Sequence, residues 1–338
     1  MREKIGIGII GAGYWGPNLI RNFNEIDDCR IVWVCDLKPG RRQYIQERFP
    51  GIPVTADPDR VLSDRAVEAV VVATPVFTHC EIGMAALSAG KHLWVEKPLA
   101  DSVAAARKLV AEADSRGLVL LTNHLFVYNP AIKKAKEIIS QGGVGELYYA
   151  ESGRVNLGPP ASEVDVIWDL ATHDLAITCY LWGKTPVELV AYGRRFQHPQ
   201  LIDMAFIHLH FADDTAAVHH VSWMCPEKIR RYFVAGEKGS LIFDDTQLEK
   251  KLRFIDQGVD SRIGADAHEV KNLFYKPGEV RFPELERIEP LRAACEDFLK
   301  NVRHGGQPRA DGAAGLTVIQ LLEAAEQSIA QGSQLIRF

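Results

Sequence analysis

The chain has 338 residues, of which 47% are hydrophobic and 25% charged, with a formal net charge of −5. This balance is typical of a globular protein and provides no basic field that would attract nucleic acid or anionic lipid, so neither partner is expected. The six cysteines form no CxxC pair, and no stretch reaches 18 apolar residues. A cytoplasmic protein with reduced thiols and no membrane anchor is therefore expected.

The first third of the chain alternates short runs rich in β-branched residues with helical patterns. This order predicts βαβ units, in which helices cover both faces of a doubly wound parallel sheet. The expected strands are residues 5–10, 31–35, 69–73, 92–95 and 118–121, and the expected helices are residues 17–23, 41–48, 78–89 and 102–116. Thr78 is expected to cap the third helix in a capping box with Glu81.

From about residue 124 the pattern changes to longer alternating strands. The segments AFIHLHF and AVHHVSW flank the turn ADDTA, as in a β-hairpin. The length also favours more than one domain. We therefore predict an α/β domain over residues 1–123 and an α+β domain over residues 124–338.

A glycine-rich segment, GIIGAGYWGPN, joins the first expected strand to the first expected helix. Its Gly11, Gly13 and Gly16 form a GxGxxG motif, which permits a tight turn, close approach of a pyrophosphate and close helix packing. Asp36 follows the second strand, where a carboxylate can accept hydrogen bonds from ribose hydroxyls. Together these features predict a dinucleotide site. Two more residues of the glycine loop are expected to contact the cofactor, Tyr14 and Trp15.

The charges around Asp36 favour NAD over NADP. A carboxylate repels the 2′-phosphate of NADP, although Lys38, Arg41 and Arg42 directly behind it offset part of that repulsion. The alternative interpretation is a structural glycine turn with a surface aspartate, which the complete strand, motif and helix context disfavours.

Thr74 and Pro75 come directly after the strand expected at residues 69–73. Ligands of doubly wound sheets bind at such carboxyl ends, so both residues, with His79 on the next helix, are expected to contact the cofactor. The alternative is a strand that a proline stops and a helix cap follows.

The stretch HLWVEKPLA leads an expected buried strand directly into two opposite charges. The ring of Pro98 disfavours helical geometry at Lys97 and holds it extended at the carboxyl edge of the sheet. Its ammonium can there bind a substrate oxygen and stabilise negative charge, while Glu96 balances that charge or contacts the cofactor. An ordinary charged loop is the alternative.

The stretch VDVIWDLATHDLAITCYLWG predicts a helix with His173 inside its apolar stripe. Asp169 lies one turn earlier, so carboxylate and imidazole share a side of the helix. An imidazole oriented by an aspartate is a candidate general base near neutral pH. A core histidine that an aspartate satisfies is the alternative.

These segments resemble the glucose-fructose oxidoreductase and inositol dehydrogenase family, Gfo/Idh/MocA, over nearly the whole chain. The resemblance is carried by GIIGAGYWG, VVVATPVFTH, VEKPLA, HLFVYNPAIKKAKEIISQGGVGELYYAES, WDLATHD, VAGEKGSLIFDD and ADGAAGLTVIQLLEAAEQS. It implies an N-terminal Rossmann domain and an NAD(P)-dependent dehydrogenase whose site contains Lys97, Asp169 and His173. It also implies a large, mostly antiparallel open sheet in the second domain, whose exposed face forms a homodimer or homotetramer.

Two segments depart from the family pattern. SEVDVIW stands where many relatives have a glycine run, and LLTNHLFVYNP places Asn123 and His124 where the nicotinamide ribose would lie. Of these two residues, we expect Asn123 to contact the cofactor.

The resemblance points to nucleotide-linked amino sugars or uronates as substrates. Inositol or another free sugar, or reduction of a ketosugar, is an alternative, and an NAD-binding sensor without turnover is an alternative of another class. Several basic residues could bind a carboxylate or diphosphate, although such residues are most often solvated: Arg194, Arg195, Lys228, Arg230 and Arg231.

Three histidines in the expected hairpin suggest a metal site. His208 and His210 share a face of one strand, and the turn would place His219 opposite His208. No carboxylate or thiol completes the set, and hydride transfer needs no metal, so none is expected.

Overall fold

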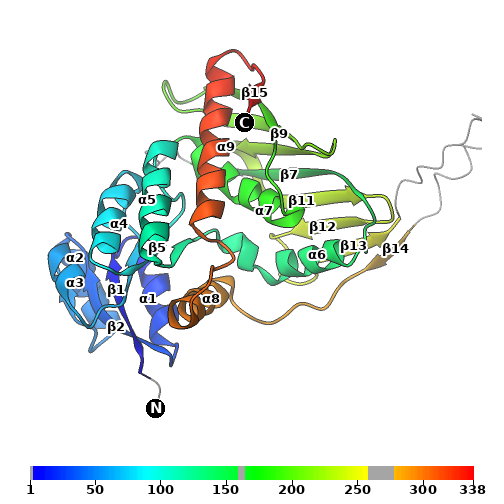
Figure 1. Cartoon of the computed structure of the whole chain (residues 1–338). Helices are drawn as coiled ribbons and strands as arrows, with labels where there is room; N and C mark the ends of the chain where they lie inside the picture. The colour runs from blue at the N-terminus through cyan, green and yellow to red at the C-terminus, as the bar shows by residue number, and fades with distance from the viewer. Residues whose placement is uncertain (1–2, 159–163, 258–277) are drawn as a thin grey trace, which may run out of the picture. The chain divides into compact units, whose positions relative to one another are not determined.

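The computed structural model describes residues 3–158, 164–257 and 278–338 of the chain (Figure 1). These form two compact units. The first contains Met1–Tyr128 and Ile288–Gln320, and the second contains Asn129–Arg287 and Leu321–Phe338. Residues 288–320 thus belong to the first unit, while the boundary after residue 123 stays a prediction. None of the described helices has the length and apolarity that a bilayer crossing requires.

The first unit is built on a six-stranded parallel sheet with the order β3-β2-β1-β4-β5-β6. The strands are β1 (Ile5–Ile10), β2 (Cys29–Cys35), β3 (Val54–Thr55), β4 (Ala69–Val72), β5 (His92–Val95) and β6 (Leu120–Thr122). The strand order reverses between β1 and β4. Ligands of such sheets bind outside the carboxyl ends of the strands at this reversal.

The helices of the first unit follow from local signals in the sequence. They are α1 (Gly16–Asn24), α2 (Pro39–Arg48), α3 (Pro58–Ser63), η1 (Val76–Thr78), α4 (His79–Ser88), α5 (Val103–Arg116), η2 (Leu125–Tyr128) and α8 (Pro290–His304). In α5, for example, the Ser102 hydroxyl accepts a hydrogen bond from the Ala105 amide, and Gly117 ends the helix with a φ of 64°.

The core of this unit explains why α8 belongs to it. Trp94 of β5 is fully buried and lies between Phe23 of α1 and Phe298 of α8. Both ring pairs are T-shaped, with centroids 5.6 Å apart. Edge-to-face packing of this kind adds to the hydrophobic gain of burying three large rings, so α8 completes the core of the parallel sheet.

The second unit contains a nine-stranded sheet with the order β14-β13-β12-β11-β7-β10-β9-β8-β15. The strands are β7 (Leu147–Leu157), β8 (Glu188–Arg194), β9 (Met204–His210), β10 (Ala216–Ser222), β11 (Met224–Gly236), β12 (Ser240–Asp244), β13 (Leu252–Asp256), β14 (Glu279–Arg281) and β15 (Ile336–Arg337). Among the described strands of this sheet, only β7 and β10 pair in parallel. The predicted fold class is confirmed for both domains.

The helical segments of the second unit lie mainly between its strands in the sequence. They are α6 (Pro130–Ser140), the π-helical turn η3 (Ile167–Ala171) and α7 (Thr172–Trp182), while the long helix α9 (Gly312–Ala330) has its last turns in this unit. The α7 helix packs on one face of the sheet, where its Thr178 hydroxyl hydrogen-bonds the Tyr232 hydroxyl of β11 at 2.6 Å.

Two local predictions are wrong. Thr78 stands at the start of α4, but its hydroxyl donates to the Pro75 carbonyl instead of capping the helix. In the β9–β10 hairpin, His208 pairs with Val218 and not with His219. A shift of one residue turns a side chain to the other face of a sheet, so His219 is buried away from His208. No cluster of three metal-binding side chains occurs among the described residues.

Candidate active site

A cavity of about 590 Å³ opens at the carboxyl ends of β1, β2, β4 and β5 in the first unit. Most of the predicted cofactor contacts line it: Gly11, Gly13, Tyr14, Trp15, Asp36, Thr74, Pro75, Glu96 and Lys97. The other three, Gly16, His79 and Asn123, are buried beside the cavity and are not part of its lining. The size is that of a ligand site, and the position is that of the switch in strand order.

The glycine loop can take this shape only because two of its residues lack a side chain. Gly11 has a φ of 102°, and a Cβ there would lie 2.5 Å from the Ala73 carbonyl oxygen. A Cβ on Gly16 would lie 2.7 Å from the Gly11 carbonyl oxygen. Gly13 has more room and borders the cavity, as expected of the glycine that a pyrophosphate approaches.

Asp36 braces the glycine loop from the end of β2. One carboxylate oxygen accepts a hydrogen bond from the Ala12 amide and the other from the Lys38 amide, both at 2.8 Å. Arg41 also reaches Asp36 at 3.3 Å, and its half-exposed guanidinium borders the cavity. The carboxylate is thus held in place by the backbone, and it retains capacity to accept from a ribose hydroxyl.

The sequence prediction missed two exposed apolar side chains that border the cavity. Leu37 is 76% exposed and Phe77 is 56% exposed, although both are large and hydrophobic. Exposed apolar side chains that share one cavity are suited to cover the faces of a planar ring. Their only sequence signal is their position, directly after Asp36 and directly after Thr74–Pro75–Val76.

His79 connects the loops that follow β4 and β5. Its imidazole is buried, with Nε2 at 2.8 Å from the Thr74 carbonyl oxygen and Nδ1 at 2.9 Å from the Pro98 carbonyl oxygen. Burial lowers the pKa of His79. The neutral imidazole has one N–H, so it donates to one of these carbonyls and contacts the other, and it lies between Thr74 and the Lys97–Pro98 segment. The peptide bond between Lys97 and Pro98 is cis.

Glu96 and Lys97 end β5 at the cavity, as predicted. Glu96 is buried, and its carboxylate accepts a hydrogen bond of 2.7 Å from the Asn123 amide nitrogen. Burial raises the pKa of Glu96 to about 7, against the opposing effects of Asn123 and Lys97. Lys97 is half-buried and lines the cavity. A potential anion and a cation thus stand side by side at the wall of the cavity.

In the second unit, Asp169 and His173 lie four residues apart where η3 continues into α7. The Asp165 carboxylate caps this segment by accepting from the Ile167 and Trp168 amides at 2.9 and 3.2 Å. Asp169 accepts a hydrogen bond from the Trp223 indole at 3.3 Å. The predicted regular helix is π-helical at Asp169, and π-turns are frequent at functional sites. Both Asp169 and His173 are half-buried and reach the surface in part.

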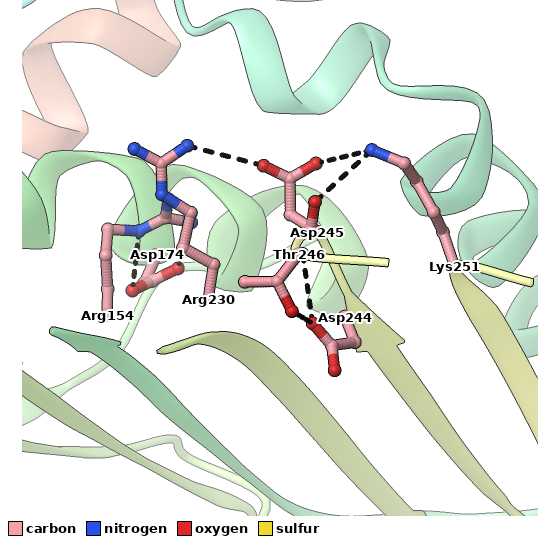
Figure 2. Close-up of polar contacts among 7 residues, drawn as sticks. All are labelled: Arg154, Asp174, Arg230, Asp244, Asp245, Thr246 and Lys251. Carbon is pink, nitrogen blue, oxygen red and sulfur yellow. Dashed lines mark hydrogen bonds and ion pairs between the residues drawn. The ribbon is translucent and has the colours of Figure 1, made fainter. Parts of the chain in front are cut away.

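A buried ion pair fixes the start of α7 to the sheet (Figure 2). The Arg154 guanidinium on β7 binds both carboxylate oxygens of Asp174, at 2.8 and 3.1 Å, and both side chains are almost fully buried. Asp174 is the neighbour of His173, so this bidentate contact sets the position of the histidine. The residue pattern alone did not identify Arg154, because its partner lies on a separate element.

The structure thus gathers the predicted cofactor residues in one unit and places Asp169 and His173 on one helical segment of the other. A joint site of Lys97, Asp169 and His173 stays a prediction. The strand order, the glycine loop and the cavity at the switch point together define a dinucleotide-binding protein of the Rossmann class.

The family follows from comparison with known proteins. Residues 5–124 match the model of an oxidoreductase family with an NAD-binding Rossmann fold, and residues 132–242 match the Gfo/Idh/MocA C-terminal domain. The chain belongs to the Gfo/Idh/MocA family of NAD(P)-dependent oxidoreductases, which confirms the resemblance seen in its motifs.

Individual relatives extend over almost the whole chain. It is 25% identical to a myo-inositol 2-dehydrogenase of Thermotoga maritima, covering 96% of each chain. It is 27% identical to a UDP-N-acetylglucosamine 3-dehydrogenase of Acidithiobacillus ferrooxidans, covering 92% of this chain and 93% of the relative. The crystal structure of GenD2 from gentamicin A biosynthesis in complex with NAD has a TM-score of 0.82 at 26% identity, covering 100% of this chain and 97% of that one.

The buried carboxyl group of Glu96 makes stability depend on pH. Because its pKa is raised from 4.5 to about 7 in the folded protein, the folded state loses stability as the pH rises from about 4.5 to about 7. We expect Glu96→Gln, which keeps the shape and can still accept from Asn123, to abolish a loss of about 3 kcal/mol over this range. Urea unfolding at several pH values measures the difference.

Asp165 does not affect the difference in unfolding free energy between wild type and Glu96→Gln. Burial also raises the pKa of Asp165 to about 7, but it is present in both proteins, so its contribution cancels in the difference. Unfolding free energies of wild type and Glu96→Gln that run parallel across this pH range would contradict the raised pKa of Glu96.

Proposed function

We propose that this protein is an NAD-dependent dehydrogenase that oxidises a ring secondary alcohol of a nucleotide-linked amino sugar or uronate. The observation that carries the proposal is the cavity at the switch point, in which Lys97 stands among the predicted cofactor contacts. When bound there, NAD would supply the hydride acceptor. Side chains of the protein bind and orient the alcohol and accept its proton.

Three side chains have separate roles in the oxidation of the alcohol. Lys97 donates a hydrogen bond to the alcohol oxygen and stabilises the negative charge that develops on it. His173 accepts the hydroxyl proton as the general base. Asp169 orients the imidazole or binds a neighbouring hydroxyl of the sugar ring. In the reverse direction the same residues would reduce a ketosugar.

The residues around the cavity fit a dinucleotide. The glycine loop leaves room for a pyrophosphate, the Asp36 carboxylate is held ready for ribose hydroxyls, and Leu37 with Phe77 can cover a base. A related structure was determined with NAD. Asp36 favours NAD over NADP, since a 2′-phosphate would meet a buried carboxylate.

Two observations support a nucleotide-linked substrate. One relative over nearly the full length is a UDP-N-acetylglucosamine dehydrogenase. In addition, Arg230 lies directly across from Arg154 in the β7–β11 pair and keeps a 35% exposed side chain, at 3.5 Å from Asp245 (Figure 2). A half-buried guanidinium beside the helix that carries His173 suits an anionic group of the substrate. Inositol is the second candidate, since a full-length relative is a myo-inositol dehydrogenase.

The open face of the nine-stranded sheet is the proposed surface of self-association. Tyr192, Phe206 and His220 form a row across β8, β9 and β10 on this face. Tyr192 is 41% exposed, and Phe206 stacks on His220 with ring centroids 4.4 Å apart. A row of partly exposed rings on a sheet suits a self-complementary contact, and we propose a homodimer or homotetramer.

Removing Lys97 or His173 should separate cofactor binding from turnover. We expect Lys97→Ala and His173→Ala to bind NAD as the wild type does but to lose turnover by about a hundredfold or more, because each removes a group that acts in the transition state. Lys108→Ala and His304→Ala, at exposed positions, serve as matched controls.

The readout is absorbance of reduced nicotinamide over a panel of UDP-sugars, free sugars and inositols, with calorimetric titration of UDP-sugars against the unlinked sugars. Heat and turnover from free sugar equal to those from its UDP derivative would contradict the nucleotide requirement. Wild-type protein that binds NAD but turns over no member of the panel would favour a sensor.

Cofactor preference should depend on Asp36. We expect Asp36→Ser to weaken NAD binding about tenfold, because a charged acceptor is lost, and to strengthen NADP binding, because the Arg41 guanidinium is left without an opposing carboxylate. Titration of both cofactors by quenching of intrinsic fluorescence measures this. Tighter binding of NADP than of NAD by the wild type would refute the preference.

A charge on the open face should break the assembly. We expect Tyr192→Glu combined with Phe206→Glu to reduce the molar mass in light scattering to that of the 37.6 kDa chain, because two carboxylates would be buried in the contact. Leu248→Glu, at a 96% exposed position, is the control. An unchanged mass of the double variant would exclude this face.

A further inference from the structure

His124 follows β6 directly, beside the end of β5. Val95 pairs with Thr122 in the two parallel strands, so the next residues, Glu96 and Asn123, stand side by side, as their 2.7 Å hydrogen bond shows. His124 and Lys97 are the next residues in the chain after this pair. The positive charge of Lys97 is near enough to affect the ionisation of the imidazole.

The imidazole of His124 is buried without a partner. The residue is 2% exposed, and neither ring nitrogen has a hydrogen bond to any residue that the structure describes. Leaving the two ring nitrogens of His124 unpaired costs about 1–3 kcal/mol each. A histidine at this position is therefore explained by a ligand, a water or a side chain that hydrogen-bonds it in the working enzyme.

Two other buried histidines of this chain, unlike His124, have hydrogen-bond partners. Both ring nitrogens of His79 lie within 2.9 Å of backbone carbonyl oxygens. His219 contacts the Ser152 hydroxyl at 2.8 Å and the Thr178 hydroxyl at 3.1 Å. These histidines serve as structural connectors, whereas the ring of His124 is available for hydrogen bonding.

The protonation state of His124 defines what it can bind. Burial first, and then the charge of Lys97, lower the pKa of His124 to about 4. At neutral pH the ring is therefore uncharged, with one donor and one acceptor nitrogen. The Lys97 ammonium has three donors and no acceptor, so it complements the free acceptor nitrogen of the neighbouring ring.

We propose that His124 is a positioning residue for Lys97, accepting a hydrogen bond from its ammonium directly or through one water and thereby aiming Nζ at the substrate oxygen. This inference rests on the proposed role of Lys97 in the dehydrogenase reaction. A hydrogen bond of this kind accounts for a polar side chain at a site where an apolar one would avoid the burial cost.

Nuclear magnetic resonance tests the contact without any substrate. In protein labelled with ¹⁵N at its 11 histidines and saturated with NAD, the His124 signals are identified by their loss in His124→Gln. We expect the acceptor nitrogen of His124 to move to the position of an unbonded imidazole nitrogen in Lys97→Met, while the His79 signals stay in place. The same ¹⁵N shifts of His124 in wild type and Lys97→Met would overturn the proposal.

Kinetics test the consequence of the contact. We expect His124→Phe, which fills the space without an acceptor, to lower kcat about 10- to 100-fold with unchanged affinity for NAD, and His124→Gln, which restores an acceptor oxygen, to recover most of that loss. Wild-type turnover in His124→Phe, or equal loss in both variants, would overturn it. A wild type inactive on every sugar would refute the proposed function and leave the resonance test decisive for the contact.

Discussion

The close approach of two backbone segments at the switch point shapes the whole cofactor site. Gly11 hydrogen-bonds through its amide to Cys35 on one side, and its Cα faces the Ala73 carbonyl on the other. Any side chain at Gly11 would force the ends of β1 and β4 apart. Because the loops after these strands form the cavity wall, the cavity exists only while this contact is kept.

The loops around the cavity are joined to one another by hydrogen bonds that bring together distant parts of the sequence. Asp36 holds Ala12, His79 joins Thr74 to Pro98, and Asn123 binds Glu96. Each contact links the end of one strand to the end of a neighbouring strand. The polar side chains of the site therefore belong to a connected frame, which limits the reorganisation needed when a ligand binds.

The parts of the fold that follow local rules could be predicted from the sequence. The strands at residues 5–10 and 92–95 are confirmed to the residue, because apolar runs bounded by glycine or proline mark them clearly. The two-residue strand β3 and the six-residue helix α3 are too short to show a period. The glycine loop was predictable because its chemistry is confined to one segment.

Features that depend on pairing between distant segments could not be predicted. The register of the β9–β10 hairpin differs by one residue from the expected one, and this moved His219 to the buried face. The return of α8 to the first unit depends on Phe298 meeting Trp94, which no local pattern indicates. Arg154 and Asp174 are only 20 residues apart but lie on different elements, and their contact appears only once β7 and α7 are packed.

Because Arg154 and Asp174 are buried, their ion pair responds to salt differently from the less buried charges of the second unit. Dissolved ions screen charges that water surrounds, but they barely reach a pair that is enclosed in protein. The support of α7 should hold its strength across ionic strengths, while the proposed attraction of the half-buried Arg230 for an anion should fade as salt is added. Ionic strength therefore becomes a means of varying the binding of the proposed anionic substrate while the helix that carries His173 stays anchored.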